Sequence, residues 1–305
     1  MALETELGGY SIVEKIAVGG MAEVYRARAA AGTQRSTDEP ADVVLKRLLP
    51  QFRANQAYIG LFVQEGKLCV RLKHANLVRT YKVFKKGMDY FMVQELVDGR
   101  SLGAIHERAR ARGIPVGVAG AVFAVHELVR ALEHVHKLRH GEGAAVTVHG
   151  DVNPANLLVS RGGDVKLTDF GVAMPEGSSA HGEGGTVRGT LTHMAPEQVL
   201  GKAIDRRADL FSAGVILWEL LSNRQLVDAK SEYDAMQKAR EARVPLLSNI
   251  RNDLPDLLVQ IVRKSVFADP ALRFQEAGEF ANALEVLGRR ANLRLGPDTL
   301  APEAT

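Results

Sequence analysis

The stretch HGDVNPAN at residues 149–156 and the tripeptide DFG at residues 169–171 decide how this sequence is interpreted. Together they hold two carboxylates, Asp151 and Asp169, and the amide of Asn156. Carboxylate and amide oxygens suit Mg²⁺ when phosphate oxygens complete its shell, and a carboxylate beside a hydroxyl can take its proton. These residues therefore offer the positioning and charge compensation that phosphoryl transfer asks of a protein.

Charged residues further out along the chain complete this chemistry in a consistent order. Lys46 ends the apolar run VVLK, and Glu65 follows it inside a predicted amphipathic helix. The string APE occupies residues 195–197, and Arg273 lies in the string DPALRF. With these motifs the chain resembles a bacterial serine/threonine protein kinase of the eukaryotic-like (Hanks) type, over roughly residues 7–290.

The resemblance implies a role for each side chain that carries the chemistry. Lys46 would hold the α- and β-phosphates of ATP, and Glu65 would pair with that lysine. Asp151 would be the catalytic base. Asn156 and Asp169 would bind Mg²⁺.

The same resemblance implies further positions for bracing and for nucleotide binding. Asp209 would brace the catalytic loop, and Arg273 would pair with Glu197. The loop from Ala17 to Ala22 would cover the phosphates, and Gln94 would be the gatekeeper before the hinge. The nucleotide-binding residues implied in this way are Val18, Gly19, Gly20, Met21, Val24, Lys46, Gln94, Glu95 and Val97.

Several positions depart from the family pattern. Ala17 and Ala22 replace two glycines of the phosphate loop, which keeps a close backbone approach but loses access to positive φ. Gly150 replaces the arginine that binds a phosphorylated activation-segment residue, so we expect activity that does not depend on such a phosphate. Asn153 replaces a lysine that contacts the transferring phosphate. We count Asn153 among the catalytic residues and interpret it as tuning the rate, because an amide can still donate a hydrogen bond.

The activation segment carries the residues that concern the substrate. Thr190 is retained, and in the family this threonine favours serine and threonine substrates, whereas His193 replaces a tyrosine. Thr186 occupies the place of the primary phosphosite and is the expected site of autophosphorylation, with Ser178 and Ser179 as weaker candidates. The expected partner is a protein substrate with a serine or threonine hydroxyl.

Composition limits the other classes of protein. Of 305 residues, 46% are hydrophobic and 25% are charged, as in ordinary soluble proteins. The net charge, 39 − 36 = +3, comes from scattered residues and gives no indication of nucleic-acid binding. Cys69 is the one cysteine, so no internal disulfide can form. The first residues do not resemble a secretory signal, and the longest apolar stretch, Leu210–Leu221, is too short to span a bilayer. We therefore expect a cytosolic protein.

Hydrophobic periodicity divides the chain into a β-rich part and a helical part. Strands are expected at residues 10–18, 23–29, 43–45, 77–84 and 90–96, with a mobile surface loop at 30–41. Helices are expected at residues 58–72, 118–135, 210–221, 254–266 and 275–287. We predict an α+β, bilobal protein-kinase fold with a small antiparallel β-sheet N-lobe (1–97), a larger helical C-lobe (98–290) and a flexible tail (291–305).

Two other functions stay open at this point. A pseudokinase, which binds nucleotide or a partner protein without catalysis, is favoured by the altered phosphate loop, Gly150 and Asn153. It is opposed by the intact ionic and amide positions. A small-molecule phosphotransferase would share the catalytic-loop pattern but lack the APE segment and the Arg273 anchor. A zinc site of the protease type is excluded because His126-Glu127 has no second histidine four residues after the first.

Overall fold

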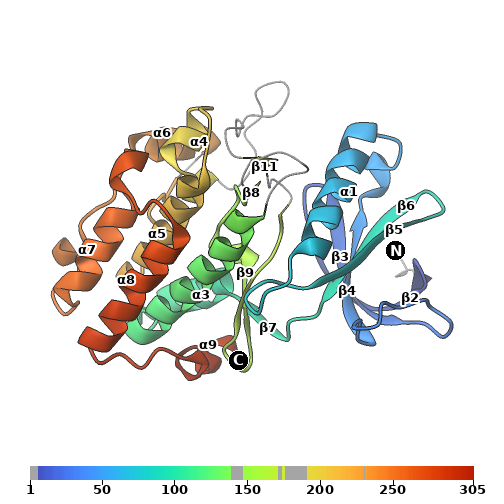
Figure 1. Ribbon diagram of the computed structural model, residues 1–305, viewed down its shortest axis with the longest axis horizontal. Coiled ribbons are helices and arrows are strands. Elements are labelled where there is room, and N and C mark those ends of the chain that lie inside the picture. Colours follow the sequence, from blue (N-terminus) through green and yellow to red (C-terminus); the bar gives the residue numbers. More distant parts are fainter. Residues whose placement is uncertain (1–5, 139–146, 171–173, 176–190, 230) are drawn as a thin grey trace. The chain divides into compact units, whose positions relative to one another are not determined.

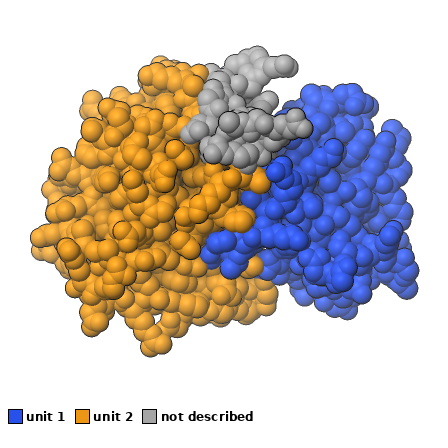
Figure 2. All heavy atoms as spheres, in the orientation of Figure 1, with its two compact units in different colours: residues 1–97 blue, residues 98–305 orange. Residues whose placement is uncertain are grey.

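The computed structural model describes residues 6–138, 147–170, 174–175, 191–229 and 231–305. The chain forms two compact units, residues 1–97 and residues 98–305 (Figure 2). The first unit holds the main β-sheet and the second holds most of the helices. The predicted α+β organisation is confirmed.

The first unit is built on a six-stranded antiparallel sheet in the order β1-β2-β3-β4-β6-β5 (Figure 1). Because β4 lies inside this sheet, Lys46 pairs with Val24 on one side and with Met92 on the other. Two neighbouring strands therefore fix the backbone that carries Lys46. The strands are β1 (Glu6–Leu7), β2 (Tyr10–Val18), β3 (Ala22–Ala29), β4 (Asp42–Leu48), β5 (Thr80–Lys86) and β6 (Asp89–Glu95).

Helix α1 (Gln56–Arg71) packs on this sheet. The side chain of Asn55 accepts two hydrogen bonds from the first turn and begins the helix. Phe62 is fully buried against β4 and β6. A Cβ on Gly66 would lie 2.8 Å from Val83 of β5, so glycine is what lets the helix approach the strand this closely.

A buried acid anchors the connection between β3 and β4, residues 30–41. Glu39 is 4% exposed and accepts hydrogen bonds from the Tyr10 hydroxyl and from the Ser36 N–H. The Lys82 ammonium lies 3.1 Å from the same carboxylate. The polar composition predicted a mobile surface loop. The segment is largely exposed, as predicted, but partners on β2 and β5 hold Glu39 in place, and mobility of the rest stays a prediction.

The second unit consists mainly of helices, and α3 lies beside both α5 and α8 (Figure 1). Helix α5 is buried along nearly its whole length, as its apolar sequence predicted. No helix in the described part of the chain is both long and apolar enough to cross a membrane. The helices of this unit are α2 (Leu102–Arg112), α3 (Val118–Lys137), α4 (Pro196–Val199), α5 (Arg206–Ser222), α6 (Glu232–Glu241), α7 (Asp256–Ser265), α8 (Ala277–Arg290) and α9 (Ala301–Ala304).

Short strands bracket the catalytic-loop stretch, residues 149–156. Strand β8 (Thr147–Val148) enters it and pairs with β11 (Met174–Pro175), and β9 (Leu157–Ser160) leaves it. Strand β9 lies between β10 (Val165–Leu167) and β7 (Gly99–Ser101). Pairing on both sides thus fixes the two ends of the loop. The 3₁₀ turns are η1 (Pro50–Phe52), η2 (Pro154–Asn156), η3 (Leu191–His193), η4 (Leu247–Asn249), η5 (Pro270–Leu272) and η6 (Pro297–Thr299).

The C-terminal segment packs on the second unit instead of fraying. Turn η6 contacts α3, and α9 contacts β9 and β7. Leu300 is fully buried, and Arg100 donates a hydrogen bond to the main-chain oxygen of Thr305 at 3.0 Å. The proline content of residues 291–305 predicted a flexible tail. The structure corrects that prediction, because Leu300 and Ala304 are buried apolar positions.

Candidate active site

The first unit contains a buried ion pair at the predicted phosphate-binding lysine. The Nζ of Lys46, on β4, lies 2.9 Å from Oε1 of Glu65, on α1. The two residues are 8% and 4% exposed. A lysine held in this way by a carboxylate keeps its ammonium in one place, which is what a phosphate-binding cation requires.

The second unit orients the carboxylate of Asp151 with two amides. Asn153 donates from Nδ2 to Oδ1 of Asp151 at 3.0 Å, and Asn156 donates from Nδ2 to Oδ2 at 3.1 Å. The Oδ1 of Asn153 in turn accepts from the N–H groups of Ala155 and Asn156. The structure thus brings together three of the predicted site residues and fixes both oxygens of the candidate base.

Asp209 of α5 holds the backbone of the same loop. Its fully buried carboxylate accepts from the N–H of His149 at 2.9 Å and from the N–H of Gly150 at 2.8 Å. His136 of α3 lies 2.8 Å from the same carboxylate. Burial alone would raise the pKa of Asp209, but His136 and the N–H of Gly150 outweigh it and hold the pKa below its ordinary value. The predicted bracing aspartate therefore lies against the loop as an ionised acceptor.

The backbone conformation at residue 150 favours glycine. Its φ is +79°, in the left-handed region where glycine carries no steric cost. Its N–H is bonded to Asp209, and its carbonyl accepts from Nε2 of Gln198 at 3.0 Å. The loop is therefore held at residue 150 through its backbone.

The segment that contains Asp169 is tied to the catalytic loop through main-chain contacts. The N–H of Thr168 donates to the carbonyl of Asn156 at 2.9 Å. The ring of His149 lies 4.6 Å from the ring of Phe170, and its Nε2 lies 3.3 Å from the carbonyl of Thr168. Asp169 has a φ of +61°, and its partner in the tripeptide, Gly171, lies outside the described residues. These contacts link the segments that carry the two predicted Mg²⁺ ligands.

The donor set of Asn156 and Asp169 fits a magnesium ion that is held largely by substrate phosphate. Both hydrogens of the Asn156 amide face oxygens of Asp151, so Oδ1 is the atom left for a cation. Mg²⁺ is usually held by one or two protein oxygens together with phosphates and water. The described residues contain no group of three or more acidic, histidine or cysteine side chains that could hold a metal. The described residues thus do not form a metal site in which all ligands come from protein side chains.

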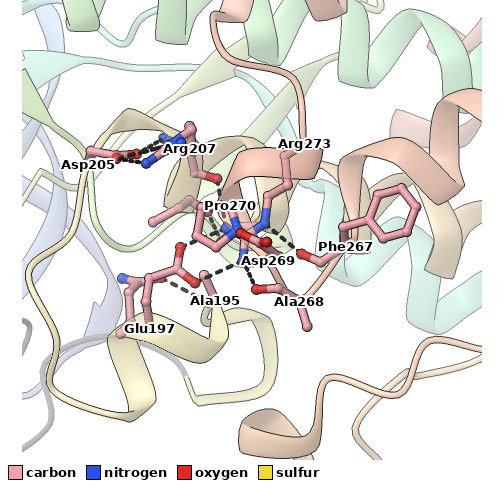
Figure 3. Close-up of polar contacts among 12 residues, drawn as sticks. Ala195, Glu197, Asp205, Arg207, Phe267, Ala268, Asp269, Pro270 and Arg273 are labelled. Atoms are coloured by element: carbon pink, nitrogen blue, oxygen red, sulfur yellow. Dashed lines mark hydrogen bonds and ion pairs between the residues drawn. The ribbon is translucent and has the colours of Figure 1, made fainter.

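Arg273 locks the end of the activation segment to the helical core (Figure 3). Its Nη1 and Nη2 donate to the two carboxylate oxygens of Glu197 at 2.6 and 2.8 Å. Its other hydrogen bonds go to the carbonyls of Phe267, Ala268 and Arg207, so all five N–H donors are used. The guanidinium is fully buried and also lies 4.7 Å from the ring of Phe211.

His193, the residue that replaces a tyrosine of the family pattern, links a threonine to a buried glutamate. Its Nε2 lies 2.9 Å from Oε2 of Glu219, and its Nδ1 lies 2.9 Å from the Thr192 hydroxyl. Oε1 of Glu219 accepts from the N–H of Leu226. Burial alone would raise the pKa of Glu219, but the hydrogen bond and charge of His193 outweigh it and lower that pKa.

The predicted nucleotide-binding residues lie on β2, β3, β4 and β6 or beside them. Val18 is 60% exposed at the end of β2, where the Gly19 N–H donates to the carbonyl of Ala22 at 2.8 Å. Gln94 is buried and donates to the Thr80 hydroxyl at 3.3 Å. Nucleotide contact stays a prediction for all of these residues, which include Gly20, Met21, Val24, Glu95 and Val97.

Three residues that support this site were not predicted from the sequence. Gln198, Glu219 and His136 contact the loop or its supports, as described above. The sequence does offer an indication for Gln198, because this residue directly follows the APE string. For His136, the periodicity of α3 already put the residue beside the buried positions of that helix. The expected phosphosites Ser178, Ser179 and Thr186, and also Thr190, lie outside the described residues.

Comparison with known proteins agrees with this geometry. A family model described as the protein kinase domain matches residues 10–277. The tyrosine-protein kinase MasK of Myxococcus xanthus is 32% identical over 282 residues, which make up 91% of this chain and 43% of MasK. The serine/threonine-protein kinase PknL of Mycobacterium tuberculosis is 30% identical over 284 residues, covering 93% of this chain and 67% of PknL.

A third relative, the serine/threonine-protein kinase PrkC of Bacillus subtilis, is 28% identical over 270 residues, which make up 88% of this chain and 39% of PrkC. The chain thus spans less than half the length of MasK and of PrkC. The family match covers both structural units and every residue placed in the site above. The chain belongs to the protein kinase family, in the Hanks-type group that the sequence resembles.

Proposed function

We propose that this chain is a serine/threonine protein kinase that transfers the γ-phosphate of ATP, in the presence of Mg²⁺, to a hydroxyl of a protein. The observation that carries the proposal is the orientation of Asp151, whose two carboxylate oxygens are each held by an asparagine amide. Such a carboxylate is ready to accept the proton of an incoming hydroxyl. Mg²⁺ bound with ATP would neutralise charge that develops on the phosphates.

Each unit contributes its own part to this reaction. In the first unit, the ion pair with Glu65 keeps the ammonium of Lys46 in place for the α- and β-phosphates. In the second unit, Asn156 presents an oxygen to the cation while its nitrogen holds Asp151. In this proposal each cluster is preorganised within its own unit, which lowers the barrier because its side chains need not be ordered during transfer.

We also propose that phosphate on the activation segment is not required for activity. The loop backbone at Gly150 is held by Asp209 and Gln198, both of which are present without any modification. An arginine–phosphate contact would therefore add little to its order. Protein treated with a phosphatase, and the Thr186→Ala variant, should keep the activity of untreated protein.

The test of the proposal is transfer of labelled γ-phosphate from ATP and Mg²⁺ to the protein itself and to a generic basic protein, with Asp169→Asn as control. We expect labelling that the Asp169→Asn variant abolishes. Phosphoamino-acid analysis then separates phosphoserine and phosphothreonine from phosphotyrosine, a distinction that matters because MasK is named a tyrosine kinase. ATP binding without any transfer would instead support the pseudokinase interpretation.

A further inference from the structure

A cavity of about 750 Å³ lies in the first unit, between the turn that joins β1 to β2, the connection from β3 to β4, and strand β5. Neither Lys46 nor Glu65 lines this cavity, so it is separate from the predicted phosphate-binding lysine. Pockets that hold small ligands have volumes of about 300–1,000 Å³. The cavity is therefore large enough to be a binding site of its own.

The charged residues around this cavity are mainly basic. Lys82 is already neutralised, because its Nζ lies 3.1 Å from the carboxylate of the buried Glu39. The other three basic residues face a single acidic residue of the lining, Glu6, which is exposed. A surplus of positive charge therefore remains. The basic residues of the lining are Arg35, Lys82, Lys85 and Lys86.

The contacts of these three cations supply no negative charge. Arg35 donates to the main-chain carbonyl of Glu39 at 3.3 Å, and Nζ of Lys85 lies 5.2 Å from the centre of the Tyr90 ring. Within the described residues, no acidic side chain forms an ion pair with Arg35, Lys85 or Lys86. Charges of one sign that line a hollow with low-dielectric walls add up to a strong local potential. The cavity should therefore attract an anion.

A pair of glycines keeps part of the cavity free of side chains. Gly8 and Gly9 form the turn between β1 and β2, with φ values of +63° and +97°. A Cβ on Gly9 would lie 3.4 Å from Oγ1 of Thr33 and 3.6 Å from Nζ of Lys86. The Thr33 hydroxyl and the N–H of Ala30 both donate to the Gly9 carbonyl. The turn is thus tied to the connection from β3 to β4, and the Lys86 ammonium lies beside the space that the glycine leaves.

We propose that this cavity binds a phosphate monoester, at a site separate from the proposed ATP site. Arg35 and Lys86 contact the phosphate oxygens, and the partly buried ring of Phe84 contacts an apolar part of the ligand. A phosphate monoester carries a charge of about −1.5 to −2 near neutral pH. It therefore matches the surplus of cations better than a carboxylate does, and arginine can bind it with two hydrogen bonds. The inference does not rest on the proposed function.

The experiment uses the full chain and two probes, because a small metabolite and a phosphorylated side chain carry the same group. The probes are phenyl phosphate and an end-capped peptide with one phosphoserine between alanines. ¹H–¹⁵N NMR spectra should show saturable shifts of main-chain amides at residues 8–9, 31–36 and 82–86 with at least one probe. The same peptide without phosphate should leave these amides unshifted.

Single substitutions test whether the cations bind the phosphate. Arg35→Gln and Lys86→Gln change exposed side chains, so both variants should fold, and each should weaken binding by roughly three- to tenfold. Lys67→Gln is the matched control, because Lys67 is an exposed lysine of α1 that does not line the cavity. It should bind both probes as wild type does.

The two probes also identify the source of the ligand. Tighter binding of the phosphopeptide assigns the site to phosphorylated proteins, and tighter binding of phenyl phosphate assigns it to small phosphate compounds. The inference is overturned if neither probe shifts the cavity amides, or if the unphosphorylated peptide shifts them equally. Unchanged affinity in both Arg35→Gln and Lys86→Gln would also overturn it. Because these spectra require no phosphoryl transfer, the result is independent of whether the proposed kinase activity holds.

Discussion

Asn153 shows how much a single residue can differ from what its position suggests. Its place in the sequence suggested an amide that donates to the transferring phosphate. In the structure its nitrogen donates to both the carboxylate and the carbonyl of Asp151, and its oxygen accepts from Ala155 and Asn156. Asn153 is 3% exposed. We therefore infer that it acts by positioning the base.

Two substitutions of Asn153 distinguish the role of its Nδ2 donor from that of its Oδ1 acceptor. Asn153→Asp keeps the acceptor for the following N–H groups but removes the donor and puts a second carboxylate beside Asp151. We expect it to lose about ten- to a hundredfold in kcat, because a hydrogen bond to a charged group contributes about 1.5–3 kcal/mol. Asn153→Ala also loses the cap and should be less stable by about 1 kcal/mol. Kinetics and thermal melting check this, and full activity in Asn153→Asp would contradict it.

The alanines of the phosphate loop are a second case at this scale. Ala17 and Ala22 were expected to restrict the loop, because alanine, unlike glycine, does not readily adopt positive φ. In the structure Ala17 pairs with Val24 beside a register shift in β2, Ala22 pairs with Leu48, and neither alanine has a positive φ. Neither position needs a conformation reserved for glycine. The sequence motif could identify the loop, but only the strand register shows that these replacements carry no backbone strain.

Among the elements, α3 and α8 are joined by a histidine between two acids. The Nδ1 of His126 lies 2.9 Å from Glu127, and its Nε2 lies 3.2 Å from Glu285 on α8. Burial alone would lower the pKa of His126. The hydrogen bonds and charges of the two glutamates outweigh burial and raise the pKa above its ordinary value of 6.5.

This contact should make stability depend on pH in a defined direction. Because the folded pKa is raised, the stabilisation by His126 is fully present below the unfolded value of about 6.5 and is lost as pH rises through the folded pKa. The difference in unfolding free energy between wild type and His126→Gln should therefore be larger at about pH 6 than at about pH 9. Urea unfolding at both pH values measures it. Glu285→Gln should weaken the dependence, and a difference that grows with pH would refute the assignment.

The helices that could not be predicted from the sequence were missed for one physical reason. Helices α2 and α6 have few large apolar residues, and the buried face of α6 consists of Ala235 and Ala239. Small side chains give weak hydrophobic periodicity even where they are buried. Helices with a strong stripe, such as α3 and α5, were predicted, as were β2, β4 and α1. Residues such as Gln198 and Glu219 gain their roles only from tertiary neighbours, which local patterns do not contain.

At the scale of the whole molecule, the C-terminal segment is an integral part of the second unit. Leu300 is fully buried, and the turn before it contacts α3. Leu300→Ala should lower the free energy of unfolding by about 2–5 kcal/mol, since it removes buried methyl groups and leaves a cavity. Leu272→Ala is the control, because Leu272 is 54% exposed and should cost little. Chemical denaturation of both variants tests this, and equal stability would restore the picture of a frayed tail.

The two units also explain which parts of the site the sequence could predict. Motif order placed Lys46 and Glu65 in one region and Asp151, Asn156 and Asp169 in the other, and each cluster is assembled within its own unit. These residues carry chemistry that few other residue types can supply. The supports behind them use generic amides, carbonyls and histidines. Such residues are visible only once the chain has folded.

The contact between Asp209 and the backbone of His149 and Gly150 has a consequence for hydrogen exchange. Both amides donate to a carboxylate that is 1% exposed and belongs to the helix at the centre of the second unit. Amides held in this way exchange with deuterium only when the surrounding core opens, not through local fluctuation. We therefore expect the two residues just before the proposed catalytic base to belong to the most slowly exchanging part of the molecule. Loss of activity on heating would coincide with cooperative melting of this unit rather than precede it.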